Sequence, residues 1–294
     1  MGLHPLPNGV VLEAPSANEA RILYREVFEA NGYLRHGVTV RDGDTVLDVG
    51  ANVGAFSAAL AHAHAGLRLL LFEPIPATFE LLERNAARLL AGADTTLVNA
   101  GLGSAPGRAA FELDPWSSFE ASAAFASRVC AADDGPDLLT RTRAALADGA
   151  RAGVLRPRLG RLLSGALERR GSRAALLGAL RAGGHGMDLL RARRTVRVQC
   201  EVTTVSAVLH EHALDTVDLL KIDVEGAEWD VLQGIEPGDW PRLRQLVLEV
   251  HNVDGRTDHV RALLERHGYR VTVEAADWES MRLRGLCNVF AVRD

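Results

Sequence analysis

The sequence predicts an α/β fold built on one doubly wound, Rossmann-like sheet whose strands are parallel for the most part. Apolar runs of strand length alternate with segments of helical spacing along most of the chain. Several of these runs are apolar throughout, as expected of parallel strands that are buried on both faces. The last two runs, 269–275 and 287–292, predict a terminal hairpin that places one antiparallel strand in the sheet.

The individual elements follow in chain order. Ser16 or Asn18 can cap a helix over 17–31, which would pack across the mouth of a ligand site. Strands are expected near 45–49, 68–72, 95–99, 109–113, 196–204, 217–222, 245–250, 269–275 and 287–292. Helices are expected over 54–65, 76–91, 226–233 and 256–267.

The most specific local pattern is Asp48-Val-Gly-Ala-Asn-Val-Gly54, which follows an apolar strand. Gly50 and Gly54 allow the backbone to approach a ligand closely, and the next helix offers free N–H groups at its start. The pattern is neither the G-x-G-x-x-G dinucleotide fingerprint nor a P-loop. Asp48 would repel the phosphates of NAD or ATP but can stabilise a cationic ligand. S-adenosylmethionine carries an ammonium group and a sulfonium and has no phosphate, so it is the favoured ligand.

An acid follows the second strand at the distance that a nucleoside site requires. The apolar run 69–72 ends in Glu73-Pro74, about 20 residues past the glycine turn, where a carboxylate can accept both ribose hydroxyls of an adenosine. A helix N-cap or a surface acid is the other interpretation of Glu73. The neighbouring glycine pattern makes that interpretation the weaker one.

Two later strands carry polar groups at their carboxyl ends. The segments are 218–228 and 246–252, and open α/β sheets hold their ligands at this end of the strands. The groups predicted to converge there are Asp223, Glu225, Glu249 and His251.

Together these motifs resemble the FkbM-type S-adenosylmethionine-dependent methyltransferases. The resemblance covers about residues 24–115 and 196–255. It rests on Tyr24-x-Glu26, Tyr33, Asp48-Val-Gly-Ala-Asn-Val-Gly54, Glu73-Pro74 with Asn85, Asn99-Ala-Gly-Leu102, Lys221-Ile-Asp-Val-Glu-Gly226 and Glu249-Val-His251. The resemblance implies a class I methyltransferase sheet and S-adenosylmethionine as the cofactor.

The motifs and the resemblance together give the expected site residues. Those expected to bind the cofactor are Asp48, Gly50, Asn52, Gly54, Ser57, Glu73, Pro74, Asn99, Leu102 and Asp223. Those expected to serve catalysis are His251, Glu225, Asp223, Glu249 and Lys221. Lys221 is the only lysine of the chain, which indicates a specific role.

The acids and the histidine of this group admit two catalytic uses. His251 can act as the general base that takes a proton from an acceptor hydroxyl, with Glu225 or Glu249 orienting the ring. A Mg²⁺ ion held by Asp223, Glu225 and Glu249 is the competing use, since hard cations prefer oxygen ligands. A histidine that merely ends a strand is the third interpretation. We expect the general base and no metal site.

Composition indicates the compartment. The three cysteines, Cys130, Cys200 and Cys287, are odd in number and widely spaced, which argues against a disulfide framework or a zinc site. The N-terminus lacks a charged leader, and no apolar run approaches the length of a membrane span. We therefore expect a cytoplasmic protein without a membrane partner.

One segment, 127–194, breaks the alternation of strands and helices. It is rich in alanine, leucine and arginine, and its leucines have the spacing of two or three amphipathic helices. Within 141–194 thirteen arginines oppose three acids, although the whole chain has a net charge of −5. We expect a cap over the acceptor pocket that attracts an acidic acceptor, or one tethered to an acidic carrier protein. A solvated helix face and a subunit contact in a homo-oligomer are the alternatives.

These observations divide the chain into three parts. An N-terminal helical cap segment covers 1–45, the class I methyltransferase domain covers 46–126 and 195–294, and the arginine-rich insertion covers 127–194. The resemblance implies an O-methyltransferase that acts on a hydroxyl of a specialised metabolite or sugar-containing small molecule. An N-methyltransferase and an inactive scaffold that binds through the insertion are the alternatives. Nucleic acid is not an expected substrate, because an aromatic content of 5% leaves few rings for base stacking.

Overall fold

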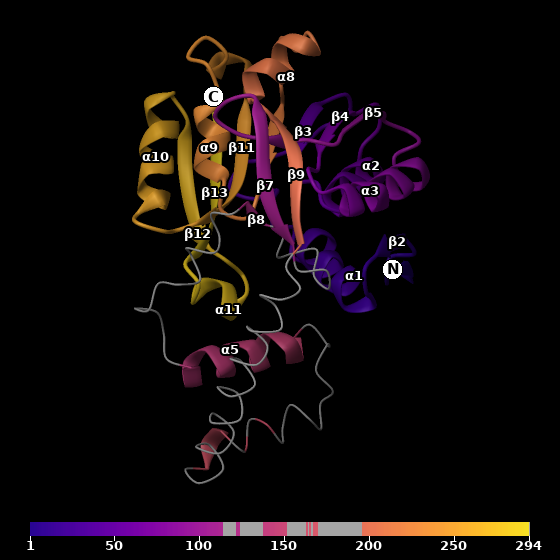
Figure 1. The fold of residues 1–294 in the computed structure, drawn as a ribbon, viewed down its shortest axis with the longest axis vertical. Helices are drawn as coiled ribbons and strands as arrows, with labels where there is room; N and C mark the ends of the chain where they lie inside the picture. The colour runs from indigo at the N-terminus through magenta and orange to yellow at the C-terminus, as the bar shows by residue number, and fades with distance from the viewer. Residues whose placement is uncertain are drawn as a thin grey trace.

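The centre of the molecule is a seven-stranded sheet in the order β12-β13-β11-β10-β3-β4-β5 (Figure 1). The computed structural model describes residues 1–113, 122–123, 138–151, 163, 165, 167–169 and 196–293. The strands of the central sheet are β3 (Thr45–Val49), β4 (Arg68–Phe72), β5 (Asp94–Val98), β10 (Leu219–Ile222), β11 (Gln245–His251), β12 (Arg270–Ala275) and β13 (Leu286–Val292). Every pairing is parallel except those of β13, which runs antiparallel to β11 and β12. The predicted doubly wound sheet with a terminal antiparallel hairpin is confirmed.

Helices cover both faces of this sheet, which explains why its inner strands are apolar throughout. The helices are α2 (Ala55–Ala63), α3 (Pro76–Leu89), α8 (Val205–Glu211), α9 (Glu228–Gln233) and α10 (Arg256–Arg266). Alternate residues of β4 enter two different cores: Leu69 and Leu71 pack with α2 and α3, whereas Leu70 and Phe72 pack with α8, α9 and α10. A short 3-10 helix, η3 (Trp240–Arg242), precedes β11.

Two strands expected from the sequence belong to a separate sheet. That sheet has the order β6-β9-β7-β8 and contains β6 (Gly101–Leu102), β7 (Gly107–Leu113), β8 (Ser122–Ala123) and β9 (Val196–Thr203). The strand runs near 109–113 and 196–204 are thus correct as strands, but they pair antiparallel with each other outside the central sheet. Leu113 pairs with Val196, so these two described residues, one before and one after the expected insertion, lie side by side.

The N-terminal segment forms a hairpin and then a helix that changes type. The hairpin is β1 (Gly2–Pro5) with β2 (Val11–Ala14), and α1 (Ala17–Tyr24) continues into a π-helical turn, η1 (Arg25–Glu29). Ser16 caps α1, since its hydroxyl oxygen accepts a hydrogen bond from the Glu19 N–H at 3.2 Å. A π-turn widens the helix locally and is frequent at functional sites.

One helix of the expected insertion lies within the described residues. This helix, α5 (Leu138–Arg151), packs against α11 (Glu279–Arg282), whose Glu279 N–H donates to Asp148 Oδ1 at 3.1 Å. Most of the other helical positions expected over 127–194 fall outside the described residues. The division of the chain into three parts stays a prediction. None of the described helices has the combination of length and apolar character that a membrane span needs.

Candidate active site

The glycine turn after β3 packs directly on the end of β10. Gly50 has φ +77, and a Cβ at this position would lie 1.8 Å from the carbonyl oxygen of Asp223. Gly54 has φ +83, and a Cβ there would lie 2.7 Å from Leu82 Cδ1 of α3. Gly50 is therefore required by a backbone contact inside the protein, whatever the turn binds, whereas at Gly54 the left-handed backbone favours glycine because the end of the Leu82 side chain can move.

Asp48 was predicted to face a cationic ligand, but its carboxylate is paired with the side chain of Lys221. Its side chain is fully buried, Lys221 Nζ lies 3.1 Å from Oδ1, and the Ser57 hydroxyl donates to Oδ2 at 2.8 Å. Lys221 also donates to the Gly50 carbonyl at 2.9 Å. Burial would lower the pKa of Lys221, but the charges of Asp48 and then Asp223 outweigh it and raise this pKa. Lys221 thus links β10 to the glycine turn.

Glu73 and Asn99 hold together the ends of β4 and β5. The Glu73 carboxylate accepts hydrogen bonds from the N–H groups of Asn52 at 3.1 Å and Ile75 at 2.9 Å. Asn99 Nδ2 donates to the carbonyl oxygens of Glu73 and Pro74. Burial raises the pKa of Glu73 to about 7, against the effect of its two backbone donors.

Apart from Asp223, which follows β10, the predicted cofactor residues divide into two groups. Those around Glu73 gather at the carboxyl ends of β3 and β4, as expected. Ser57 and Leu102 are buried in the core together with Asp48. Contact with the cofactor stays a prediction for both groups.

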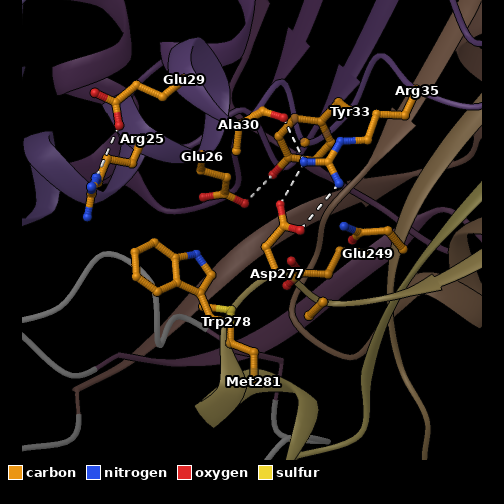
Figure 2. A pocket seen from close by; sticks show the side chains of 13 residues that line it. Arg25, Glu26, Glu29, Ala30, Tyr33, Arg35, Glu249, Asp277, Trp278 and Met281 are labelled. Atoms are coloured by element: carbon orange, nitrogen blue, oxygen red, sulfur yellow. Dashed lines mark hydrogen bonds and ion pairs between the residues drawn. The ribbon is translucent and has the colours of Figure 1, made fainter. Parts of the chain in front are cut away.

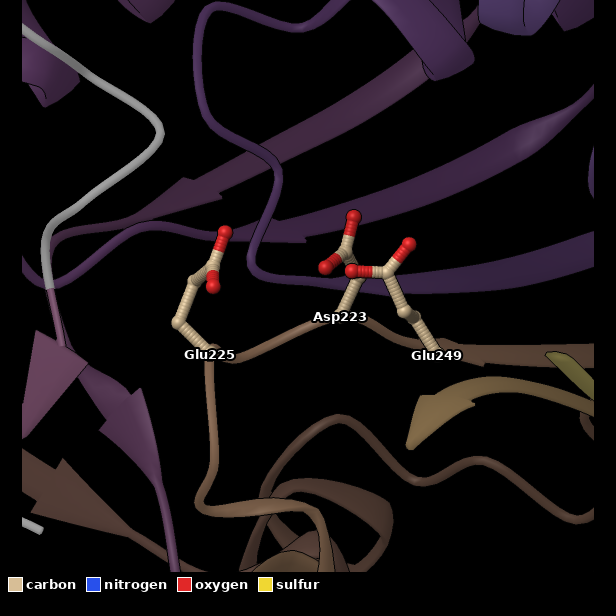
Figure 3. A group of neighbouring side chains, drawn as sticks. All are labelled: Asp223, Glu225 and Glu249. Atoms are coloured by element: carbon tan, nitrogen blue, oxygen red, sulfur yellow. The ribbon is translucent and has the colours of Figure 1, made fainter. Parts of the chain in front are cut away.

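Three carboxylates converge at the ends of β10 and β11 (Figure 3). Asp223 directly follows β10, Glu225 lies two residues further on, and Glu249 is on β11. One ligand atom from each of the three lies within 4.8 Å of the others. Burial, followed by the charges of the neighbouring acids, raises the pKa of Glu249 well above its usual range.

The loop that carries two of these carboxylates has an uncommon backbone. Glu225 has φ +51 and Gly226 has φ +104, so the left-handed region is occupied twice in succession. For a glutamate this conformation is unfavourable and is retained where the surroundings enforce it. The glycine of the Lys-Ile-Asp-Val-Glu-Gly motif is explained by this turn.

Tyr33 and Glu26 extend the acidic cluster toward the N-terminal segment. The Tyr33 hydroxyl lies 3.0 Å from Glu26 Oε1 and 2.9 Å from Asp223 Oδ2, and it has one proton to share between the two. Burial and then the charge of Asp223 raise the pKa of Glu26 to about 7. The sequence contained both residues among the motifs of the resemblance, but neither was assigned to the site. Only the fold brings them to the ends of β10 and β11.

His251, the predicted general base, is enclosed by acids. Nε2 lies 3.4 Å from Glu225 Oε2, and Nδ1 lies 3.2 Å from Oε1 of the fully buried Glu228, which also faces Arg256. Burial would lower the pKa of His251, but the hydrogen bonds with Glu225 and Glu228 outweigh it and raise this pKa to about 10. Both nitrogens of such a charged ring carry protons, so the ring cannot accept another one.

A pocket of about 380 Å³ opens beside the acidic cluster (Figure 2). Glu26 and Tyr33 line one side of it, Glu249 lines it from β11, and Trp278 and Met281 line it from the segment that contains α11. Glu249 belongs to both the pocket and the carboxylate cluster. The sequence did not indicate this pocket, because its walls come from residues far apart in the chain.

The two arginines of the pocket already have acidic partners. Arg25 Nε lies 3.1 Å from Glu29 Oε2, while Arg35 lies 2.8 Å from Asp277 and 3.3 Å from Glu274. Their charges are therefore largely balanced before any ligand enters.

Comparison with known proteins identifies the family. The family described as Methyltransferase FkbM domain matches residues 162–271. The 31-O-demethyl-FK506 methyltransferase FkbM of Streptomyces tacrolimicus is 35% identical over 92% of this chain and 89% of its own length. The chain belongs to the FkbM methyltransferase family. Methyltransferase sdnD of Sordaria araneosa is 28% identical over 90% of this chain and 88% of its own. A solved FkbM methyltransferase from Methylobacillus flagellatus KT is 13% identical with a TM-score of 0.47, over 91% of this chain and 47% of that one.

Membership of the FkbM family confirms the resemblance drawn from the motifs. It also implies S-adenosylmethionine as the methyl donor. The chain has the sheet and the glycine turn expected of an enzyme that uses this cofactor.

Proposed function

We propose that this FkbM-family protein is an O-methyltransferase that acts on a hydroxyl of a small-molecule specialised metabolite or sugar moiety. The observation that carries the proposal is a pocket of about 380 Å³ whose wall contains the carboxylates of Glu26 and Glu249. Pockets of this size are typical of small-molecule sites, and an oxygen acceptor needs a group that takes its proton. The Streptomyces relative, whose name specifies an O-demethyl substrate, supports the same reaction.

In this proposal the residues at the ends of β3 and β4 would hold the cofactor. Glu73 would accept hydrogen bonds from the ribose hydroxyls, and the glycine turn and the start of α2 would contact the rest of the molecule. Asn52 supports this placement, because its side-chain oxygen is buried and receives no hydrogen bond from any described residue. Its φ of +51 is a further constraint within the turn.

Methyl transfer is a direct displacement. The acceptor oxygen forms a bond to the methyl carbon, the carbon–sulfur bond breaks, and sulfur keeps the electron pair in S-adenosylhomocysteine. The hydroxyl proton must go to a base, and the rest of the catalysis is alignment in a site that excludes water.

The surroundings of His251 favour a different base. His251 could act only after passing a proton to Glu225, because both of its nitrogens face carboxylates. Glu26 lies in the pocket wall and has a pKa of about 7, close to the value that suits a base at neutral pH. We therefore propose Glu26 as the base and His251 as a positioning residue that holds Glu225.

The test is methyl transfer from ¹³C-methyl-labelled cofactor to hydroxylated small molecules from an extract of the producing strain. The chemical shift of the transferred carbon distinguishes an O-methyl from an N-methyl product. An O-methyl product supports the proposal, and an N-methyl product would replace it with the amine alternative. Cofactor binding without any transfer would favour the scaffold.

A further inference from the structure

We propose that Asp223, Glu225 and Glu249 form a binding site for one divalent cation of the hard class, Mg²⁺ or Mn²⁺, beside the proposed acceptor pocket, which Glu249 lines. The use of this ion in catalysis rests on the proposed function; the binding itself does not. The sequence alone left a metal site as the competing use of these three acids, and the geometry now favours it.

The three acids are placed as a ligand set by two neighbouring parallel strands. β10 pairs with β11 from Leu220 to Ile222, so the residues that follow β10 and those near the end of β11 reach the same edge. The ligand atoms already lie within 4.8 Å of one another (Figure 3). Oxygens on opposite sides of a Mg²⁺ ion are about 4 Å apart, so small side-chain rotations complete the contact.

Glu249 gives the second and independent indication of a ligand. Its side chain is more than nine-tenths buried and lines the pocket, yet no described residue donates a hydrogen bond or forms an ion pair with it. A buried carboxylate without a partner is unfavourable, and buried charges are normally paired or bound to a metal. A cation at this point supplies the partner that the protein does not.

The cationic side chains near this cluster are too few to pair with all of its carboxylates. Six carboxylates lie in this part of the described structure, whereas three cationic side chains lie close to them. Lys221 is shared between Asp48 and Asp223. His251 lies between Glu225 and Glu228, and Arg256 faces Glu228. The six acids are Glu26, Asp48, Asp223, Glu225, Glu228 and Glu249.

Free oxygens remain for the ion on both loop acids. Tyr33 and Lys221 both approach Oδ2 of Asp223, which leaves Oδ1. His251 approaches Oε2 of Glu225, which leaves Oε1. Three single-oxygen ligands leave open positions on a six-coordinate ion. An acceptor hydroxyl bound there would have a lowered pKa and a fixed position, which is the contribution that such ions make to proton removal.

The experiment measures Mn²⁺ binding to the full chain by electron paramagnetic resonance, with and without saturating S-adenosylhomocysteine. We expect one Mn²⁺ per chain, retained when the cofactor product is present and displaced by Mg²⁺. Glu249→Gln keeps the shape of the side chain and should weaken Mn²⁺ binding roughly tenfold or more. The matched control Glu29→Gln removes an acid from the same pocket outside the ligand set and should leave the affinity unchanged.

Three results would overturn the proposal: no Mn²⁺ binding at millimolar concentration, equal weakening by both variants, or displacement of Mn²⁺ by S-adenosylhomocysteine. The last would mean that the acids hold the cofactor instead. Thermal unfolding of each variant verifies that it is folded, and Asp223→Asn provides a second variant of the ligand set. Calorimetry on the same samples separates this proposal from the proposed function. Product binding without Mn²⁺ binding defeats the metal site alone.

Discussion

The site has two parts: a proposed cofactor half at the ends of β3 and β4, and a proposed acceptor half at the ends of β10 and β11. The two halves differ in how the charges of their acidic side chains are neutralised. At the ends of β3 and β4, Asp48 is paired with Lys221, and Glu73 accepts two backbone hydrogen bonds. At the ends of β10 and β11, carboxylates face one another, and Glu249 has no partner among the described residues. The proposed cofactor half is therefore organised without a ligand, whereas the proposed acceptor half leaves negative charge for a bound group to neutralise.

The largest expected effect comes from replacing Gly50 in the cofactor half by a residue with a side chain. A Cβ at this position would lie 1.8 Å from the Asp223 carbonyl, and the left-handed backbone is unfavourable for alanine. We expect Gly50→Ala to reduce the free energy of unfolding by about 4 kcal/mol or more. Urea denaturation measures the change. Gly43→Ala is the control, because Gly43 has a similar φ of +83 and nothing within 4 Å, so only the backbone term of about 1–2 kcal/mol remains. Equal losses would show that the contact with Asp223 is unimportant.

A second test removes the internal cation. Lys221→Met leaves Asp48 buried without its ion pair, and we expect a loss of about 3 kcal/mol in unfolding free energy. Adding Asp48→Asn should restore part of this loss, since the neutral amide no longer needs a cation. If the double variant is less stable than the single one, Lys221 does not act mainly on Asp48.

Variants of Glu26 and His251 test which of the two residues is the general base in the acceptor half. Glu26→Gln should lower kcat by about 10²–10⁴-fold if Glu26 takes the proton, with little effect on the affinity for S-adenosylhomocysteine. His251→Asn should have a smaller effect on kcat, because it removes only the residue that positions Glu225. The reverse order in single-turnover rates would return the role of base to His251.

The pH dependence of cofactor binding distinguishes the halves further. Because the pKa of Glu73 is about 7 in the free protein, its carboxylate becomes fully charged only above neutral pH. The affinity for S-adenosylhomocysteine should therefore rise as pH increases through 7, and this rise should be absent in Glu73→Gln.

The raised pKa of Glu73 also predicts how the stability of the fold changes with pH. The pKa of Glu73 is raised on folding, so the associated stability is fully present below the unfolded value of about 4.5 and is lost as pH rises through 7. Thermal unfolding of the wild type should show this loss relative to Glu73→Gln. Parallel pH profiles for the two proteins would remove Glu73 as its cause.

The smallest effect concerns the arginine-rich insertion, for which we propose attraction of an acidic acceptor. Its described helix α5 contacts α11, and α11 contributes Met281 to the pocket. Surface charges are screened over about 8 Å at physiological salt, so the acceptor KM should rise with salt while cofactor affinity barely changes. Charge reversal at Arg169 and Arg170 should act in the same direction. Indifference to both would leave a steric lid or a subunit contact.

The sequence predicted the central sheet well because its signals are local. The strands β3, β4 and β11 are continuous apolar runs, and the glycine turn must follow β3 for steric reasons centred on Gly50. The grouping of Asp223, Glu225 and Glu249 also followed from topology, since parallel strands end at one edge. These features need no knowledge of distant contacts.

The features that sequence reasoning missed depend on pairing between distant segments. The strands β7 and β9 form their own sheet through an antiparallel register that no local pattern encodes. The short elements β1, β2, β6 and β8 and the helices α8 and α11 lack the length that gives a clear period. The raised pKa of His251 depends on Glu225 and Glu228, and only the fold brings the Glu228 carboxylate to Nδ1.

The most direct measurement of the difference between the two halves is a calorimetric titration of S-adenosylhomocysteine into three metal-free proteins. These are the wild type, Glu73→Gln and Glu249→Gln. We expect the wild type and Glu249→Gln to bind with the same affinity, and Glu73→Gln to bind more weakly because the ribose hydroxyls lose a charged acceptor. Failure of the wild type to bind, or an equal loss of affinity in the two variants, would contradict the division of the site into a cofactor half and an acceptor half.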